Sequence, residues 1–210
     1  MKKKILACLL ILFPIFSLGI AKADTVKSKY IIASDSSFAP FVFQNSNNEY
    51  TGIDMDLIKA IAKDQGFEIE ITNPGFDAAI SAVQAGQADG IIAGMSVTDA
   101  RKATFDFSES YYTANTILGV KESSTIASYE DLKGKTVGVK NGTASQTFLT
   151  ENQSKYGYKI KTFSDAASMY DSLNTGSIDA VMDDEPVIKY SISQGQKLKT
   201  PIAGTPIGET

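Results

Sequence analysis

The chain has 210 residues, a formal net charge of −4, and 43% hydrophobic and 21% charged residues, the composition of an ordinary globular protein of one or two domains. It contains no histidine, no tryptophan and a single cysteine, Cys8. Beyond the N-terminal segment, the chain therefore has no disulfide framework, thiol nucleophile, histidine base or zinc site built from His or Cys. Because nucleic-acid binding needs a basic face, we expect no nucleic-acid partner.

The first 23 residues have the pattern of a secretory signal peptide. Lys2, Lys3 and Lys4 form a positive start, residues 5–20 are an apolar run, and residues 21–23 read Ala-Lys-Ala, a cleavage signal. We predict cleavage before Asp24 and export to the periplasm or the outer face of the membrane. An uncleaved anchor is the alternative, because the apolar run is close to the length of a membrane-spanning helix.

Apolar periodicity then predicts alternating strands and helices. The first half is expected to contain a strand at 29–34, a helix at 52–65, a strand at 67–72, a helix at 76–85 and a strand at 88–93. An extended segment at 111–121 and a polar stretch at 123–128 lead into a second half. There, strands at 135–140, 158–163 and 177–182 alternate with helices at 143–152 and 165–174. This order predicts an α/β fold with largely parallel sheets.

The two halves contain an internal repeat. Residues 82–91 (AVQAGQADGI) align with residues 172–181 (SLNTGSIDAV), each copy being a helix end, a Gly stop, an Asp and a buried strand. Two similar lobes are expected, each presenting the C-terminal end of an equivalent strand, where open parallel sheets bind ligands.

The stretch that follows the first copy is built like an anion site. A buried strand reaches Ala93 and Gly94, where small residues allow close approach of a ligand, and Ser96 adds a hydroxyl. Thr98 is a candidate helix N-cap, which places free N–H groups nearby. Arg101 is the sole arginine of the chain, and its guanidinium can hold a carboxylate through two hydrogen bonds. A surface arginine on a capped helix is the alternative interpretation.

The corresponding stretch of the second half is acidic, with Asp183, Asp184 and Glu185 before Pro186. A cleft with Arg101 on one side and a carboxylate on the other suits a zwitterion, which carries an α-carboxylate and an α-ammonium. The alternative is that the acidic residues merely cap the following helix.

These motifs together resemble the polar amino-acid substrate-binding proteins of ABC importers, with the two-lobed "Venus flytrap" fold, and are most similar to the glutamine-binding group. The resemblance spans the chain from about Tyr30 to its last residue. The matching segments are 35–41, 52–57, 93–101, 105–108, 111–112, 131–135, 139–144 and 179–186.

The resemblance implies a role for each site residue. Arg101 would hold the α-carboxylate, assisted by N–H groups near Ser96 and Ala144 and by the hydroxyls of Ser96 and Thr143. Asp184 and the Gly94 carbonyl would accept protons of the α-ammonium.

The side chain of the ligand would lie between two aromatic rings. The resemblance assigns the sandwich to Phe38 and Phe76, although core packing is the commoner role of phenylalanine. Asp35 would meet the polar end of the ligand, and Lys140 would help to define that subsite. Asp35 suits a lysine or arginine ligand, but Lys140 would repel such a cation, so we expect glutamine or a similar neutral amide.

The resemblance also implies the organisation of the chain. We expect a first lobe at 24–115, a second at 116–204 and the start of a returning hinge strand at 205–210, with the first lobe incomplete at its C-terminal side and apolar surface exposed on it. We expect a monomer without a cofactor, with an amino acid as its ligand and an ABC permease in the membrane as its partner. The alternatives are an enzyme using carboxylates such as Asp35 or Glu185, which nothing in the sequence isolates as an acid–base pair, and a sensor module or a binding domain fused to its permease.

Overall fold

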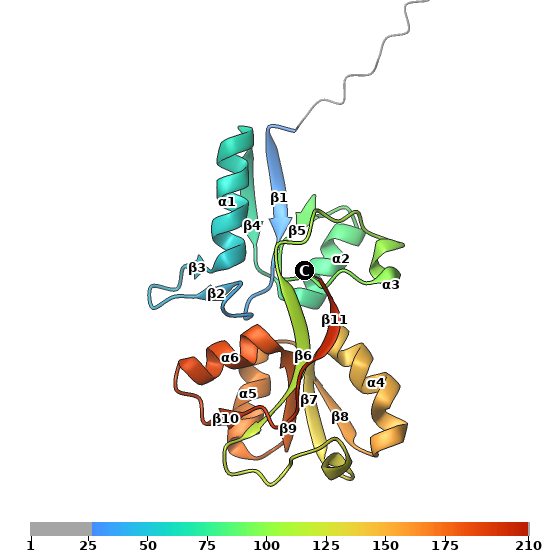
Figure 1. Ribbon diagram of the computed structural model, residues 1–210. Helices are drawn as coiled ribbons and strands as arrows, with labels where there is room; N and C mark the ends of the chain where they lie inside the picture. Colours follow the sequence, from blue (N-terminus) through green and yellow to red (C-terminus); the bar gives the residue numbers. More distant parts are fainter. Residues whose placement is uncertain (1–26, 210) are drawn as a thin grey trace, which may run out of the picture.

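The computed structural model describes residues 27–209, arranged as two α/β lobes stacked one above the other (Figure 1). The predicted signal segment lies outside these residues. The two-lobed α/β fold is confirmed. No helix within residues 27–209 combines the length and apolar character needed to span a bilayer.

The first lobe is built on a three-stranded parallel sheet in the order β4-β1-β5. Its strands are β1 (Lys29–Ala33), β4 (Glu68–Thr72) and β5 (Gly90–Ile91). Its helices are α1 (Ile53–Gln65), α2 (Phe76–Gln84) and the single turn α3 (Asp99–Lys102). A two-stranded hairpin, β2 (Phe43–Gln44) and β3 (Tyr50–Thr51), precedes α1. The sequence did not predict this hairpin.

The second lobe contains a six-stranded mixed sheet, in which β11 joins β6 beside the order β10-β6-β9-β7-β8. Its strands are β6 (Thr113–Lys121), β7 (Thr136–Lys140), β8 (Lys159–Phe163), β9 (Ala180–Asp184), β10 (Leu198–Lys199) and β11 (Thr205–Glu209). The helices are η1 (Glu130–Leu132), α4 (Ala144–Tyr156), α5 (Ala166–Thr175) and α6 (Glu185–Ser193).

Two strand predictions were wrong in extent. The strand expected over 88–93 is only β5, because the chain leaves the sheet at Ile92 to form the turn around Gly94, which has φ 54°. The strand expected to end at Met182 instead continues through Asp184, where pairing with β6 reaches Thr116. The longer strand places both carboxylates at the buried end of the sheet.

The internal repeat is real in three dimensions. In each lobe the central strand, β1 or β7, pairs in parallel with two strands that occupy equivalent places in the repeat. The repeated aspartates also make the same contact. Asp89 accepts from the Ile31 N–H at 2.9 Å, and Asp179 accepts from the Thr136 N–H at 2.8 Å. Each aspartate thus ties the turn before the third strand to the central strand.

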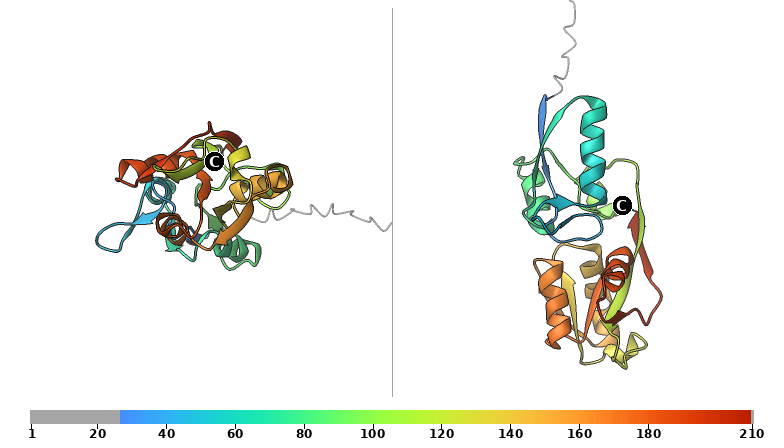
Figure 2. Two further views of the ribbon diagram at one scale, coloured as in Figure 1. Left: turned by 90° about the horizontal axis from the view of Figure 1, so that it is seen from below. Right: turned by 90° about the vertical axis from the view of Figure 1, so that its left-hand side faces the viewer.

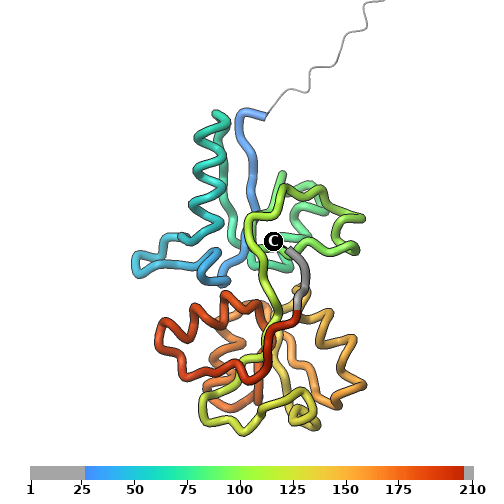
Figure 3. Tube along the Cα trace, viewed as in Figure 1, coloured from blue at the N-terminus to red at the C-terminus, as the bar shows by residue number. Residues whose placement is uncertain are grey.

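Two antiparallel strands, β6 and β11, run together along one side of the molecule between the lobes (Figures 1 and 2). The β6 strand is also hydrogen-bonded to β9 and β10, so it is an integral part of the second sheet. On the other side, the β2–β3 hairpin extends outward beside α6 (Figure 3), where the rings of Phe43 and Tyr190 lie 5.8 Å apart.

The apolar core lies on both faces of the second sheet and continues into the first lobe. Alternate residues of the strands face opposite sides, so that Val181 packs with α5 and α6 while Met182 packs with α4. The first of these clusters also contains Phe38, Phe41 and Met55 of the first lobe. Apolar surface remains exposed on α1, where Ile53 and Ile61 are 41% and 40% exposed.

Gly138 in β7 provides a test of this packing. A Cβ added there would lie 2.5 Å from Ile178 Cδ1 and 3.1 Å from a Phe163 ring carbon. We expect Gly138→Ala to lower the free energy of unfolding by about 1–3 kcal/mol, the usual effect of overpacking a core, as measured by urea denaturation. The matched control is Gly90→Ala in β5, where the added Cβ would make an ordinary 3.6 Å contact with Ile32. Equal stability of the two variants would contradict the packing described here.

Candidate functional site

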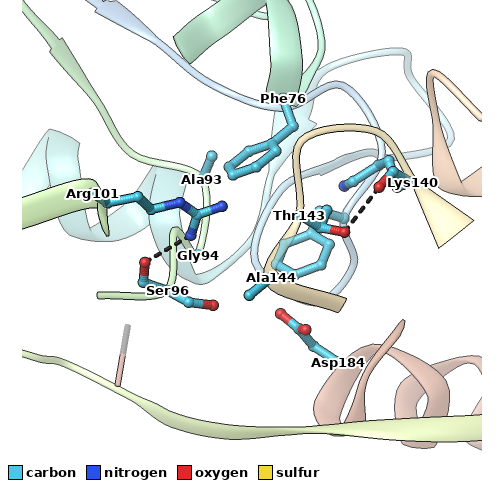
Figure 4. Close-up of a pocket in the computed structure, with 10 residues that line it drawn as sticks. Phe76, Ala93, Gly94, Ser96, Arg101, Lys140, Thr143, Ala144 and Asp184 are labelled. Carbon is cyan, nitrogen blue, oxygen red and sulfur yellow. Dashed lines mark hydrogen bonds between the residues drawn. The ribbon is translucent and has the colours of Figure 1, made fainter. Parts of the chain in front are cut away.

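The ends of the equivalent strands meet between the lobes around one small cavity (Figure 4). Its volume is about 10 Å³, because side chains from both lobes fill the space. The structure brings every predicted site residue except Asp35 to its wall and adds Ala93. The lining residues are Phe38, Phe76, Ala93, Gly94, Ser96, Arg101, Lys140, Thr143, Ala144 and Asp184.

Arg101 is positioned by its own short helix. The Thr98 hydroxyl accepts from the Arg101 backbone N–H at 3.3 Å, as expected for the N-cap of α3. From this turn the side chain points into the cavity (Figure 4). Its guanidinium donates to the Ser96 carbonyl at 2.7 Å and, across the cleft, to the Gly142 carbonyl at 2.9 Å. A ligand carboxylate would compete for these same N–H donors.

Partial burial lowers the pKa of the Arg101 guanidinium, an effect that the charge of Asp184 opposes. The Arg101 guanidinium also lies 5.5 Å from the centre of the Phe76 ring. The guanidinium thus lies beside an aromatic ring and donates to two carbonyls in a partly buried position, where a charge-assisted hydrogen bond is stronger than in water.

The region expected to form the side-chain subsite contains an ion pair between the lobes. Lys140, at the end of β7, donates to the carboxylate of Asp35, and the two side chains are 3% and 0% exposed. Asp35 is held in place by the backbone N–H of Ser36 at 2.7 Å. Asp35 is thus covered by Lys140 and does not line the cavity, and its contact with a ligand stays a prediction.

The two predicted sandwich rings both lie close to this lysine. The Lys140 ammonium is 4.4 Å from the centre of the Phe38 ring and 5.6 Å from that of Phe76. Phe38 in turn packs on the Gly94 turn, since a Cβ at Gly94 would lie 2.6 Å from a carbon of its ring. The aromatic site that could attract a cationic side chain thus already holds a cation of the protein itself.

The start of α4 supplies the donors on the second lobe. Thr143 caps this 13-residue helix by accepting from the Gln146 N–H at 3.2 Å, and its hydroxyl donates to the Lys140 carbonyl at 2.8 Å. The hydroxyl is therefore engaged within the loop. What the helix offers to an anion is its first-turn N–H groups beside Ala144.

Asp184 is the acidic counterpart of Arg101 on the opposite wall. It lies at the N-cap of α6, but its side chain makes no capping hydrogen bond, so the capping alternative is wrong for this residue. It receives a long hydrogen bond from Ser145 Oγ at 3.4 Å. Burial, followed by the charge of Asp183, raises the pKa of Asp184 to about 7, whereas Lys140 and Arg101 act in the opposite direction.

Asp183 has a different role. Its carboxylate accepts from the Asp184 backbone N–H at 2.9 Å and from the Tyr170 hydroxyl at 3.0 Å. Burial raises its pKa, and the charge of Lys140 opposes that shift. Asp183 is therefore a structural carboxylate that positions Asp184. Glu185 points away and bonds Asn115 at 2.7 Å and Lys189 at 2.5 Å.

Sequence reasoning missed two polar residues around the site. Ser145 joins Thr116 at 2.7 Å and Asp184, and Asp54 accepts from the Gly94 N–H at 2.8 Å. Both lie in the first turns of helices, where Ser and Asp are ordinary residues, and only their complete burial distinguishes them. Within residues 27–209 no group of three His, Cys, Asp or Glu side chains is arranged to hold a metal ion.

Comparison with known proteins gives the family. Residues 30–154 match the model of bacterial extracellular solute-binding proteins, family 3. The chain belongs to this family. It is 34% identical over 160 residues to the arginine-binding extracellular protein ArtP of Bacillus subtilis, covering 76% of this chain and 62% of that protein. It is 33% identical over 186 residues to the histidine-binding periplasmic protein of Escherichia coli K12, covering 88% of this chain and 71% of that one. These relatives are binding proteins, not enzymes.

Three solved structures allow the arrangement of the two lobes to be compared with that of relatives. The second substrate-binding domain of a putative amino acid ABC transporter from Streptococcus pneumoniae is 94% identical over 86% of this chain and 82% of its own, with a TM-score of 0.57. Domain 2 of Lactococcus lactis GlnP, in an open conformation, is 55% identical over 88% and 80%, with a TM-score of 0.58. An ancestral arginine-binding protein bound to arginine is only 35% identical over 87% and 82%, yet its TM-score is 0.81.

The S. pneumoniae and L. lactis domains are 94% and 55% identical to this chain, so each of their lobes should have the same fold as here. Their TM-scores of 0.57 and 0.58 therefore reflect a different placement of one lobe relative to the other. The present structure resembles the ligand-bound relative more than the open one. The contacts of Lys140 with Asp35 and of Arg101 with Gly142 are therefore contacts of a closed form.

Proposed function

We propose that this protein is an extracytoplasmic solute-binding protein that captures a polar amino acid, with glutamine favoured, and delivers it to an ABC-type permease. The observation that carries the proposal is the placement of Arg101 and Asp184 on opposite walls of one cavity between the lobes. A guanidinium and helix N–H groups suit an α-carboxylate, and a buried carboxylate suits an α-ammonium.

Closure explains how capture and release are coupled. Arg101 and Gly94 belong to the first lobe, and Asp184 and Ala144 belong to the second, so a ligand held by both groups binds the closed form more tightly than the open one. A ligand shifts the equilibrium by its differential affinity for the two forms. We infer that β6 and β11, which run between the lobes, form the hinge of this motion. Opening would separate Phe38, Phe41 and Met55 from the second-lobe residues of their shared cluster.

The charge of the side-chain subsite favours a neutral amide. Asp35 alone between two phenylalanine rings would attract a basic side chain, but Lys140 neutralises it and occupies the cation position. A lysine or arginine ligand would have to displace Lys140 and leave it buried and unpaired, which is costly. A glutamine amide can donate and accept without that cost. A basic amino acid remains the alternative ligand, because B. subtilis ArtP is named as an arginine-binding protein.

A second candidate is a binding domain that works as part of a larger transporter. It is favoured by one observation, that the 94% identical structure is described as the second substrate-binding domain of a putative amino acid ABC transporter. The coding sequence downstream of Thr210 distinguishes the two candidates, because a fused permease would add several apolar helices of about 20 residues.

The proposal is tested by calorimetric titration with the twenty amino acids and with Arg101→Ala. We expect L-glutamine to bind wild-type protein, and the variant to lose about 2–5 kcal/mol of binding free energy because the ligand carboxylate loses a buried charged partner. Lys102→Ala, in the same helical turn but exposed, is the matched control and should bind as wild type. Absence of binding by every amino acid would refute the proposed function.

Lys140 should determine ligand charge. In Lys140→Met the buried Asp35 carboxylate has no ammonium partner, so we expect arginine binding to strengthen by at least about tenfold relative to glutamine, measured by competition calorimetry. In the double variant Asp35→Asn/Lys140→Met both charges are gone, and the arginine preference should disappear. An unchanged glutamine-to-arginine ratio in Lys140→Met would show that the subsite charge does not set specificity.

The raised pKa of Asp184, about 7, predicts the pH dependence of binding. Below pH 7 the carboxyl is largely protonated in the closed form without ligand, and an α-ammonium favours the ionised form, so binding releases a proton. Glutamine affinity should therefore fall as the pH is lowered from 8 to 6. Titrations in buffers of different ionisation enthalpy measure the released protons, and Asp184→Asn should show no release from this site. Affinity independent of pH across this range would contradict the assignment.

A further inference from the structure

Asp54 is a buried ionisable residue for which the proposed function has no role. It lies in the first turn of α1, is 0% exposed, and contacts three segments that are far apart in the sequence. Its backbone N–H donates to the Phe41 carbonyl at 3.0 Å. One carboxylate oxygen accepts from the Gly94 N–H at 2.8 Å, and the other accepts from the Tyr111 hydroxyl at 2.9 Å.

Each of these three segments bears on ligand capture. Phe41 belongs to the loop that carries Phe38, and the two rings are stacked with their centres 5.3 Å apart. Gly94 forms the turn that lines the cavity. Tyr111 lies two residues before hinge strand β6. Asp54 therefore joins three segments. Its backbone N–H contacts the aromatic loop, and its carboxylate contacts the ligand turn and the approach to the hinge.

The Gly94 contact determines how the turn is presented. Gly94 has φ 54°, a conformation that only glycine adopts easily, and its N–H is turned toward Asp54. Because a peptide unit is planar, fixing this N–H also fixes the direction of the Ala93 carbonyl on the opposite edge. The turn is further held by Ser34, whose hydroxyl donates to the Ile92 carbonyl.

We propose that Asp54 is a positioning residue for ligand capture, holding the Gly94 turn in its binding orientation and linking that turn to Tyr111 at the hinge. This inference rests on the proposed function. The ionised carboxylate is the form that accepts both hydrogen bonds at once. A protonated carboxyl would have to donate from one oxygen, and would weaken one of the two contacts.

The surroundings of Asp54 make this contact sensitive to pH. Burial raises the pKa of the Asp54 carboxyl to about 6, the hydrogen bonds from Tyr111 and Gly94 oppose that shift, and the charge of Asp35 adds to it. Burial raises the pKa of Tyr111 far above its usual range, so its hydroxyl remains a donor. The Gly94 amide should therefore report the titration of Asp54 directly.

The experiment combines glutamine calorimetry at pH 7.5 with ¹⁵N–¹H NMR of the Gly94 amide between pH 5 and 8. We expect the wild-type Gly94 resonance to titrate near pH 6. In Asp54→Asn the transition near pH 6 should be lost, and glutamine affinity should fall about tenfold or more, the effect of losing a hydrogen bond to a buried charge. Asp56→Asn is the matched control, because Asp56 lies in the same helical turn but is exposed, and it should behave as wild type.

Tyr111→Phe provides a second route if Asp54→Asn does not fold. It removes a hydrogen bond that lowers the Asp54 pKa, so the midpoint of the Gly94 titration should rise, and glutamine affinity should fall severalfold. Wild-type affinity in a folded Asp54→Asn or in Tyr111→Phe, or a Gly94 resonance insensitive to both substitutions, would overturn the inference. If wild-type protein bound no amino acid, the proposed function would fail, and the Gly94 resonance alone would still decide whether Asp54 holds the turn.

Discussion

The ion pair between Lys140 and Asp35 is the interaction on which the closed form depends. Both charges are almost completely buried, and burying either one alone would cost several kcal/mol. Each charge comes from a different lobe, so neither is compensated until the lobes meet. The pair therefore disfavours any partly closed arrangement in which one charge has lost water without gaining its partner. In the closed form the pair also neutralises the two charges beside the Phe38 and Phe76 rings.

The rest of the site follows from the repeat of one structural unit. In both lobes a central parallel strand pairs with two neighbours, and an aspartate anchors the turn before the third strand. The strands that follow these aspartates, β5 and β9, differ in the residues at and beyond their C-terminal ends. β5 leads to a glycine turn and an arginine, whereas β9 carries two aspartates to its last residues. These opposite charges on equivalent strand ends are the basis for proposing a zwitterionic ligand.

Two buried carboxylates, Asp183 and Asp54, lie behind the residues that line the cavity. Burying a polar group without a hydrogen-bond partner is costly. The buried carboxylates behind the cavity each accept two hydrogen bonds. Tyr170 and the Asp184 N–H hold Asp183, and Tyr111 and the Gly94 N–H hold Asp54. The groups that face the cavity are thereby left with fewer fixed partners. Asp184 has only a long contact with Ser145, and Arg101 bonds carbonyls that a ligand carboxylate can replace.

The sequence by itself was enough to predict several helices, the two lobes and the charged residues of the candidate site. Helical periodicity and glycine stops located α1, α2 and α5, because burying one face of a helix requires apolar residues at a fixed spacing. The 90-residue repeat indicated two lobes, and the lone arginine and its acidic counterpart indicated a zwitterion site. What only the tertiary structure decided are the contacts between segments distant in sequence. Local pattern could not show that Lys140 covers Asp35, 105 residues away, or that Asp54 is a buried anchor instead of a surface residue that favours a helix start. The reason is that the burial and pairing of a charge depend on which segments pack together in the folded chain. The residues adjacent in sequence do not reveal which segments these are.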